Sequence, residues 1–205
     1  MTTFWDTHYA TPRADPRANV RLTEVAADLA PGTALDLGSG ACGDTLWLAR
    51  RGWRVTAADV SGVAIARLAG LSRELGLGDR VTAERHDLAE TFPAGCFDLV
   101  SAHYLHTPFA LPRARVLRRA AHALSPGGRL LVVDHGSVAP WSWDQEARFA
   151  SAAEVARSLE LDAGEWAVER ADALSRRATG PGGQVADVVD HLLLIRRTQR
   201  PSEEN

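Results

Sequence analysis

The segment LDLGSGACGD, from Leu35 to Asp44, decides how this chain folds. Gly38, Gly40 and Gly43 stand in the spacing G-x-G-x-x-G directly after an apolar stretch of strand length. This spacing is typical of the tight turn that joins a strand to a helix in nucleotide-binding sheets, where the helix N-terminus faces the ligand. Several folds need the same turn, so the glycines predict a nucleotide or nucleoside site without identifying the ligand.

The size and composition of the chain indicate one globular domain. It has 205 residues, of which 45% are hydrophobic, which suffices for one full core and leaves little room for a second. We expect a single domain over residues 1–198 and a disordered tail over residues 199–205. The formal net charge is -3, with 23 basic and 26 acidic residues well mixed, which argues against a nucleic-acid partner.

Cysteine usage and the N-terminus point to a cytoplasmic protein. The chain has 2 cysteines, which predict neither a disulfide framework nor a cysteine-based metal site. The N-terminal MTTFWDTHYA lacks a basic segment followed by an apolar run, and no stretch is long enough to span a bilayer. We therefore expect no contact with a membrane.

Strand-length apolar segments alternate with amphipathic helix-length segments, the pattern of an α/β domain with a largely parallel sheet. Strands are expected over residues 33–38, 53–60, 80–88, 97–105 and 129–135, and helices over residues 22–29, 44–51, 61–75 and 112–124. Ser61 is a predicted helix cap, and Ser151 with Glu154 forms a capping box for one more helix. The turn-rich TGPGGQ, residues 179–184, separates two apolar runs and predicts an antiparallel strand pair.

Acidic residues stand at the ends of the first three expected strands. These are Asp36, two residues before Gly38, then Asp59 and Asp87. Open α/β sheets bind ligands along this carboxyl edge. A carboxylate of Asp36 that points into the loop repels pyrophosphate but suits the ammonium and sulfonium charges of S-adenosylmethionine. Asp59 is placed to accept hydrogen bonds from ribose hydroxyls, and Asp87 with the backbone of Leu88 to read adenine.

With these residues in place, the chain resembles the class I S-adenosylmethionine-dependent methyltransferases over nearly its whole length. The motifs that carry the resemblance occur in the family's order: LDLGSGACGD, TAADVS, RHDLAE, FDLVSAHYLH and LSPGGRLLVVDH. The resemblance implies an α/β fold with a Rossmann-like, doubly wound sheet of seven strands in the order 3-2-1-4-5-7-6, the last strand antiparallel and helices on both faces. The N-terminal FWDTHYA looks most like the small-molecule branch that includes tellurite-resistance and thiopurine methyltransferase relatives.

The resemblance also implies S-adenosylmethionine as the cofactor and assigns its binding residues. They are Asp36, Gly38, Ser39 and Gly40 around the methionine part, Asp59 and Val60 at the ribose, Asp87 and Leu88 at the base, and His103 near the sulfonium. In relatives with this N-terminus an aromatic-rich helix folds over the cofactor, which points to Trp5 and Tyr9 in a lid of residues 1–20. The following TPRADPRAN departs from that branch because it lacks the expected tryptophan-serine-glycine element.

Three histidines at the expected mouth of the site are candidate catalytic residues. A general base is needed only where the acceptor is protonated at the working pH, and His103, His106 and His135 are placed to serve. Each also fits a structural hydrogen-bonding role. No third metal ligand is spaced to complete a site with His103 and His106, so we expect no metal ion. Trp141 and Trp143 either stack on the acceptor as a second flap or pack the loop that carries them.

The preferred hypothesis is a metal-independent methyltransferase that moves a methyl group to a sulfur, oxygen or nitrogen atom of a small molecule. Cys42 and Cys96 are too few for arsenite methylation, HYLHTPF replaces the proline-proline-aromatic motif of base amino methylation, and no cysteine nucleophile for cytosine follows the fourth strand. An NAD-dependent oxidoreductase is one alternative, disfavoured by Asp36 and by the lack of sequence for a catalytic domain. A non-catalytic S-adenosylmethionine-binding module is the other.

Overall fold

Strands and helices alternate along the chain in the computed structural model, which describes residues 1–11, 16–142 and 144–198. The strands are β1 (Thr33–Leu37), β2 (Arg54–Asp59), β3 (Val81–Arg85), β4 (Phe97–His103), β5 (Leu124–His135), β6 (Trp166–Thr179) and β7 (Val185–Arg197). The helices are α1 (Thr2–His8), α2 (Val20–Ala26), α3 (Gly43–Arg50), α4 (Gly62–Glu74), α5 (Arg113–His122) and α6 (Ala152–Ser158), with a 3-10 turn η1 (Gly78–Arg80). None of the described helices has the length and apolar character needed to cross a membrane. The tail expected to be disordered, residues 199–205, and Trp143 lie outside the described residues.

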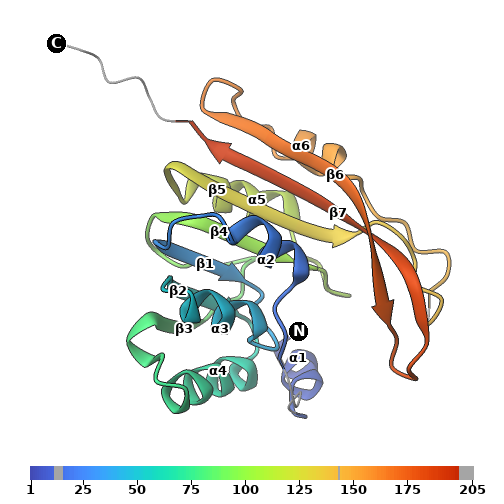
Figure 1. The fold of residues 1–205 in the computed structure, drawn as a ribbon, viewed down its shortest axis with the longest axis horizontal. Coiled ribbons are helices and arrows are strands. Elements are labelled where there is room, and N and C mark those ends of the chain that lie inside the picture. Colours follow the sequence, from blue (N-terminus) through green and yellow to red (C-terminus); the bar gives the residue numbers. More distant parts are fainter. Residues whose placement is uncertain (12–15, 143, 199–205) are drawn as a thin grey trace.

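All seven strands form one sheet in the order β3-β2-β1-β4-β5-β7-β6 (Figure 1). β1 to β5 run parallel to one another, whereas β7 is antiparallel to both β5 and β6. The sequence prediction of strand order and of an antiparallel last strand is confirmed. The order reverses between β1 and β4, and such a switch point leaves a crevice at the carboxyl ends of the strands.

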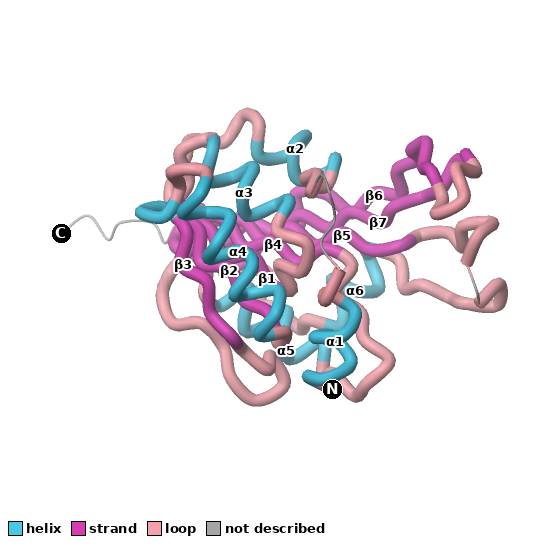
Figure 2. Tube along the Cα trace, turned by 90° about the horizontal axis from the view of Figure 1, so that it is seen from below, coloured by secondary structure: helices cyan, strands magenta, loops and turns pink. Residues whose placement is uncertain are grey.

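Alternate residues along the central strands supply the two faces of the core. On β5, Leu130 and Val132 lie in the apolar cluster that includes the buried residues of α5 and α6, whereas Leu131 and Val133 lie in the cluster with α2 and α3. A strand that is apolar on both faces is typical of a sheet covered by helices on both sides, and Figure 2 shows helices on either side of the strands. The doubly wound arrangement is therefore confirmed.

The predicted helix caps are formed by the residues expected. The Ser61 side chain accepts a hydrogen bond from the backbone N–H of Ala64 at the start of α4. At the start of α6, the Ser151 hydroxyl accepts from the Glu154 N–H, and the Glu154 carboxylate accepts from the Ser151 N–H at 2.8 Å, which completes the capping box. These local signals set where both helices begin.

The β6–β7 hairpin projects beyond the rest of the sheet (Figures 1 and 2). Its two strands stay paired out to Thr179 and Val185, whereas the pairing of β5 with β7 ends at His135 and Asp190. Residues after β5 pack on this arm, because the Gly136 N–H donates to the carbonyl of Val189 at 2.7 Å. The loop after β5 is thus held by the hairpin.

Asp190, fully buried on β7, joins the hairpin to the body of the protein. Its carboxylate accepts hydrogen bonds from Arg21 Nε of α2 at 3.3 Å and from Arg176 Nε of β6 at 2.8 Å. The hydroxyl of Tyr104, the residue after β4, donates to the same carboxylate at 2.9 Å. One buried anion therefore holds two guanidinium groups and a phenol that come from three parts of the chain.

Asp190→Ala should lower the free energy of unfolding by about 3–5 kcal/mol, because it leaves two guanidinium groups without their buried partner. Denaturant unfolding checks this, with Asp187→Ala as the control. The Asp187 carboxylate lies 3.5 Å from Arg177 with both side chains about 70% exposed (71%/70%), so its loss should cost less than about 0.5 kcal/mol. Equal losses in the two variants would contradict this role for Asp190.

Candidate functional site

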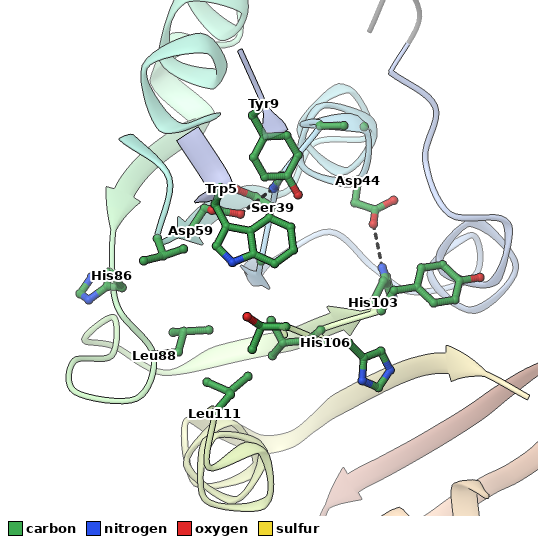
Figure 3. A pocket seen from close by; sticks show the side chains of 18 of the residues that line it. Trp5, Tyr9, Ser39, Asp44, Asp59, His86, Leu88, His103, His106 and Leu111 are labelled. Carbon is green, nitrogen blue, oxygen red and sulfur yellow. Dashed lines mark hydrogen bonds and ion pairs between the residues drawn. The ribbon is translucent and has the colours of Figure 1, made fainter. Parts of the chain in front are cut away.

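A cavity of about 370 Å³ opens at the carboxyl ends of β1 to β4 (Figure 3). Most of the residues predicted for the site line it: Trp5, Tyr9, Gly38, Ser39, Gly40, Asp59, Val60, Asp87, Leu88, His103 and His106. Asp36 and His135 are not among the lining residues. The structure therefore brings together residues from positions 5 to 106, as a ligand site at the switch point of the sheet requires.

Glycine suits the loop after β1 because other parts of the chain approach it closely. Gly40 has a φ of +39°, and a Cβ there would lie 2.5 Å from the Tyr9 hydroxyl oxygen. A Cβ on Gly43 would overlap the backbone carbonyl of Arg17. The G-x-G-x-x-G spacing therefore lets the N-terminal segment lie directly on the loop.

Asp59 ties this loop to the end of β2. One carboxylate oxygen accepts from the Gly40 N–H at 2.9 Å and the other from the Ser61 N–H at 2.8 Å. Burial raises the pKa of Asp59, while the backbone N–H bonds act in the opposite direction. Each carboxylate oxygen can accept a further hydrogen bond, and Asp59 lines the cavity, so it can also hold hydroxyl groups of a ligand.

Two polar atoms on the cavity wall have no hydrogen-bond partner among the described residues. They are the Ser39 hydroxyl oxygen and His103 Nε2, and both are buried. Buried polar atoms are nearly always hydrogen-bonded in native proteins, so both atoms have hydrogen-bonding capacity left for a bound group or a water molecule. Their placement fits a cofactor that carries polar groups into this space.

His103 is held by Asp44, which sequence reasoning did not identify. His103 Nδ1 lies 2.7 Å from Asp44 Oδ2, and the Asn19 backbone N–H donates to the other oxygen of Asp44 at 2.6 Å. A carboxylate only accepts, so Nδ1 carries the hydrogen, and in the neutral imidazole the lone pair is on Nε2. Burial lowers the pKa of His103, but the hydrogen bond to Asp44 and the negative charges of Asp44, Asp36 and Asp134 outweigh it, so the pKa is raised.

Asp36 lies beneath the loop instead of pointing into the cavity. Its carboxylate accepts from the Thr45 hydroxyl at 2.6 Å and from the Ser101 hydroxyl at 3.3 Å. Burial raises its pKa, and the neighbouring charge of Asp44 adds to the rise. Both oxygens are turned toward protein hydroxyls, so Asp36 can act on a ligand only through its charge.

The other two candidate histidines have different surroundings. His106 lines the cavity but is 42% exposed, and its Nε2 lies 3.0 Å from the Asp134 carboxylate. His135 faces away: its ring stacks on Tyr104 with 4.4 Å between the centroids and lies 5.4 Å from the ring of Phe149. Burial lowers the pKa of His135. Of the three candidate histidines, His103 and His106 therefore line the cavity and His135 does not.

The N-terminal helix α1 lies across the cavity, where the lid was expected. Asp6 accepts from the Ser61 hydroxyl at 2.7 Å and from the Val63 N–H at 3.3 Å, which fixes α1 to the start of α4. On its other side, the ring of Phe4 meets Phe109 of the loop after β4, with 5.4 Å between the centroids. The helix thus bridges two walls of the cavity and presents Trp5 and Tyr9 to its interior.

The expected second flap around Trp141 does not cover the cavity. A Cβ on Gly180, in the hairpin turn, would lie 2.5 Å from the Trp141 ring, so the tryptophan packs on the projecting arm. The loop that carries Trp141 runs along the hairpin, because the Gly136 N–H donates a hydrogen bond to Val189 of β7. The loop after β4, with Leu105 and Leu111, supplies that wall of the cavity instead.

Sequence reasoning missed several residues of the cavity wall. They are Met1, Arg17, Asn19, Ala41, Asp44, His86, Leu105 and Thr107. The sequence could have indicated Asp44 as a residue of the cavity wall, because it directly follows the third glycine of the loop at the start of a helix. No sequence pattern indicates Arg17, since its position depends on how the chain returns from α1 to the sheet.

Known proteins are similar to this chain in sequence and in fold. A family described as "Methyltransferase domain" matches residues 34–128. A protein solved in work on the conversion of a disulfide bond into a thioacetal group during echinomycin biosynthesis has a TM-score of 0.74 and 25% identity, over 98% of this chain and 95% of that one. No curated protein sequence matches the chain.

Two further solved structures share the fold. TehB from Haemophilus influenzae has a TM-score of 0.70 and 18% identity, over 97% of this chain and 67% of that one. The N-methyltransferase NodS from Bradyrhizobium japonicum, solved with S-adenosyl-L-homocysteine, has a TM-score of 0.68 and 18% identity, over 96% of this chain and 97% of that one.

Proposed function

We propose that the chain is a class I S-adenosylmethionine-dependent methyltransferase and that it transfers the methyl group to a small molecule bound beside His103, without a metal ion. One observation carries the proposal. A single cavity brings the Gly38–Gly40 turn and Asp59 at one end together with the unpartnered Nε2 of His103 at the other. A methyl donor and its acceptor need this arrangement, because donor and nucleophile must lie in line in a space closed to water.

The cofactor site follows from the loop and the strand ends. We assign the methionine part to Gly38, Ser39 and Gly40, where the Ser39 hydroxyl has no protein partner. The other assignments are Asp59 and Val60 for the ribose, Asp87 and Leu88 for the adenine, and Trp5 and Tyr9 for the cover. The bound cofactor supplies a methyl group on a sulfonium, which is already activated for transfer.

The chain's own residues orient the reactants and exclude water. The buried carboxylates of Asp36 and Asp59, with Asp44, make this end of the cavity negative, which suits a ligand with ammonium and sulfonium charges. Leu105, Leu111 and Trp5 form apolar walls toward the acceptor. The cavity of about 370 Å³ has to hold both cofactor and acceptor, so the space beside the cofactor suits only a compact acceptor.

The function is tested directly by two measurements on the full chain. Calorimetry with S-adenosylhomocysteine should show binding at one site, and a labelled methyl group from S-adenosylmethionine should pass to members of a panel of small aromatic acceptors. Binding without transfer to any acceptor would favour a non-catalytic S-adenosylmethionine-binding module. Absence of binding would defeat the proposal.

Asp59→Ala should weaken S-adenosylhomocysteine binding by about 2–4 kcal/mol, because hydrogen bonds to a charged group contribute roughly 1.5–3 kcal/mol each with partial compensation by water. Calorimetry measures the change. Asp79→Ala, an exposed carboxylate in η1, serves as the control and should bind like the parent. A thermal melt of both variants without ligand separates lost binding from lost folding, and unchanged affinity in folded Asp59→Ala would refute the ribose assignment.

Methyl transfer should continue in EDTA. His103 and His106 each have a carboxylate of their own, Asp44 and Asp134, so the two imidazoles are not arranged around a shared ion. Turnover is compared before and after dialysis against the chelator, with magnesium and zinc added back. Activity that disappears in EDTA and returns with either ion would show that a metal takes part.

Removal of residues 1–12 should lower turnover by at least about 100-fold and the melting temperature by only a few degrees. The reason is that α1 covers the cavity and aligns the reactants while contributing no fully buried side chain to the core. A methyl-transfer assay beside a thermal melt checks both values. Asp6→Asn, which keeps an acceptor oxygen for Ser61, is the mild control and should retain most activity. Full activity of the truncated protein would contradict the lid.

A further inference from the structure

We propose that Tyr104 is a positioning residue through which the projecting β6–β7 hairpin controls the cofactor turn after β1. The proposal rests on cofactor binding in this cavity, as proposed above, and adds a means of regulating it. Tyr104 directly follows β4 and lines the cavity, while its hydroxyl reaches the buried Asp190 of β7. It therefore contacts both parts of the protein that the proposal connects.

The backbone at Tyr104 adopts a conformation that bulky residues rarely take. Its φ is +49°, in the left-handed region, where a side chain with a Cβ costs free energy. Its N–H donates to the Val133 carbonyl at 2.7 Å, and its carbonyl accepts from the His106 N–H at 2.7 Å. Such a conformation persists only where the surrounding structure fixes it. The contacts of the Tyr104 side chain therefore help to hold this turn.

The side chain of Tyr104 is held by the hairpin. Its hydroxyl donates to Asp190 Oδ1 at 2.9 Å, and Arg176 Nη2 of β6 donates to the Tyr104 oxygen at 3.3 Å. Arg176 Nε also donates to Asp190 Oδ2 at 2.8 Å, which closes a network of three side chains. Asp190 is fully buried, and hydrogen bonds are stronger in such surroundings than in water. The position of the Tyr104 ring therefore follows that of the hairpin.

The next residue, Leu105, carries the effect of the hairpin to the cofactor turn. A Cβ on Gly38, whose φ is +75°, would lie 2.9 Å from Leu105 Cδ1, so the Leu105 side chain rests on this turn. Leu105 and Gly38 both line the cavity. The left-handed turn at Tyr104 sets the direction in which Leu105 points, because the two residues share a planar peptide unit. Loss of the bond between Tyr104 and Asp190 should therefore loosen the packing of Leu105 on the turn.

The rest of the loop after β4 is held independently of the hairpin. Arg113 Nε donates to the Leu105 carbonyl at 3.1 Å, and Arg113 Nη2 lies 2.6 Å from the Asp134 carboxylate. His106 Nε2 lies 3.0 Å from the same carboxylate. Asp134 of β5 thus keeps the loop in place when the Tyr104 hydroxyl is lost. We expect a graded change in the cavity and not its collapse.

Two neighbouring arginines of β6 test the connection. Arg176 bonds to the buried Asp190, whereas Arg177 lies 3.5 Å from the exposed Asp187, and neither arginine lines the cavity. In the full chain, Arg176→Met should raise the Kd of S-adenosylhomocysteine, measured by calorimetry, at least about fivefold, the lower end of the usual coupling between distinct sites. Arg177→Met is the matched control and should leave the Kd within about twofold of the parent value.

Tyr104→Phe removes only the hydroxyl and keeps the ring, which stacks on His135 with 4.4 Å between the centroids. Its Kd for S-adenosylhomocysteine should also rise at least about fivefold. Together with Leu105→Ala, the change should weaken binding by less than the product of the two single effects, because Tyr104 acts through Leu105. Thermal melts of all variants without ligand separate lost binding from lost stability, and Tyr104→Phe decides the question if Arg176→Met does not fold.

Coupling between two sites is reciprocal, which gives a readout on the hairpin itself. S-adenosylhomocysteine should slow hydrogen exchange of the backbone amides of residues 174–179 in the parent. The same protection should appear in Arg177→Met and be weaker in Tyr104→Phe at saturating ligand. A purely structural role of Tyr104 would change the melting temperature without changing this protection.

Three results would overturn the proposal. One is an equal Kd for S-adenosylhomocysteine in folded Arg176→Met and Arg177→Met, and another is the parent Kd in folded Tyr104→Phe. The third is hydrogen exchange in the hairpin that does not respond to the ligand. Each of them, with intact binding by the parent, leaves the proposed function standing. Absence of S-adenosylhomocysteine binding by the parent would overturn the proposed function and this inference with it.

Discussion

The turn from Gly38 to Asp44 must bring its backbone close to several other parts of the chain at once, and the rest of the site depends on that constraint. The Gly40 N–H bonds to Asp59 at the end of β2, and the same residue leaves room for the Tyr9 hydroxyl of the N-terminal segment. Gly43 admits the backbone of the returning chain at Arg17. A side chain at Gly40 would meet the Tyr9 hydroxyl and one at Gly43 would overlap the Arg17 carbonyl, so the N-terminal segment could not lie on the loop as it does.

The charge of the site is set by carboxylates that the fold buries. Asp36 and Asp59 are almost fully buried, and burial raises the pKa of each, so keeping them ionised without a ligand costs folding free energy. A ligand with ammonium and sulfonium charges offsets that cost, whereas a pyrophosphate increases it. The charges of Asp44, Asp36 and Asp134 also raise the pKa of His103.

Much of the fold could be predicted from local sequence signals. Ser61 and Ser151 begin helices as expected, because a helix cap depends on only a few neighbouring residues. The candidate site was predicted less completely. The bond between Asp44 and His103 joins residues 59 positions apart, and no spacing rule indicates it. Asp36 was expected to face the ligand, but Thr45 and Ser101 provide hydroxyls beneath the loop that only the assembled sheet brings to it. The roles of the cavity residues in binding and catalysis stay predictions.

The central claim is that the cofactor lies along the ends of β1 to β3 with its sulfur toward His103. A crystal structure with S-adenosylhomocysteine tests it most directly. The account predicts ribose hydroxyls within hydrogen-bonding distance of the Asp59 carboxylate, the sulfur facing His103 Nε2 with room for one acceptor atom between them, and Trp5 and Tyr9 closed over the ligand. A ligand bound outside this cavity, or one whose sulfur points away from His103, would contradict it.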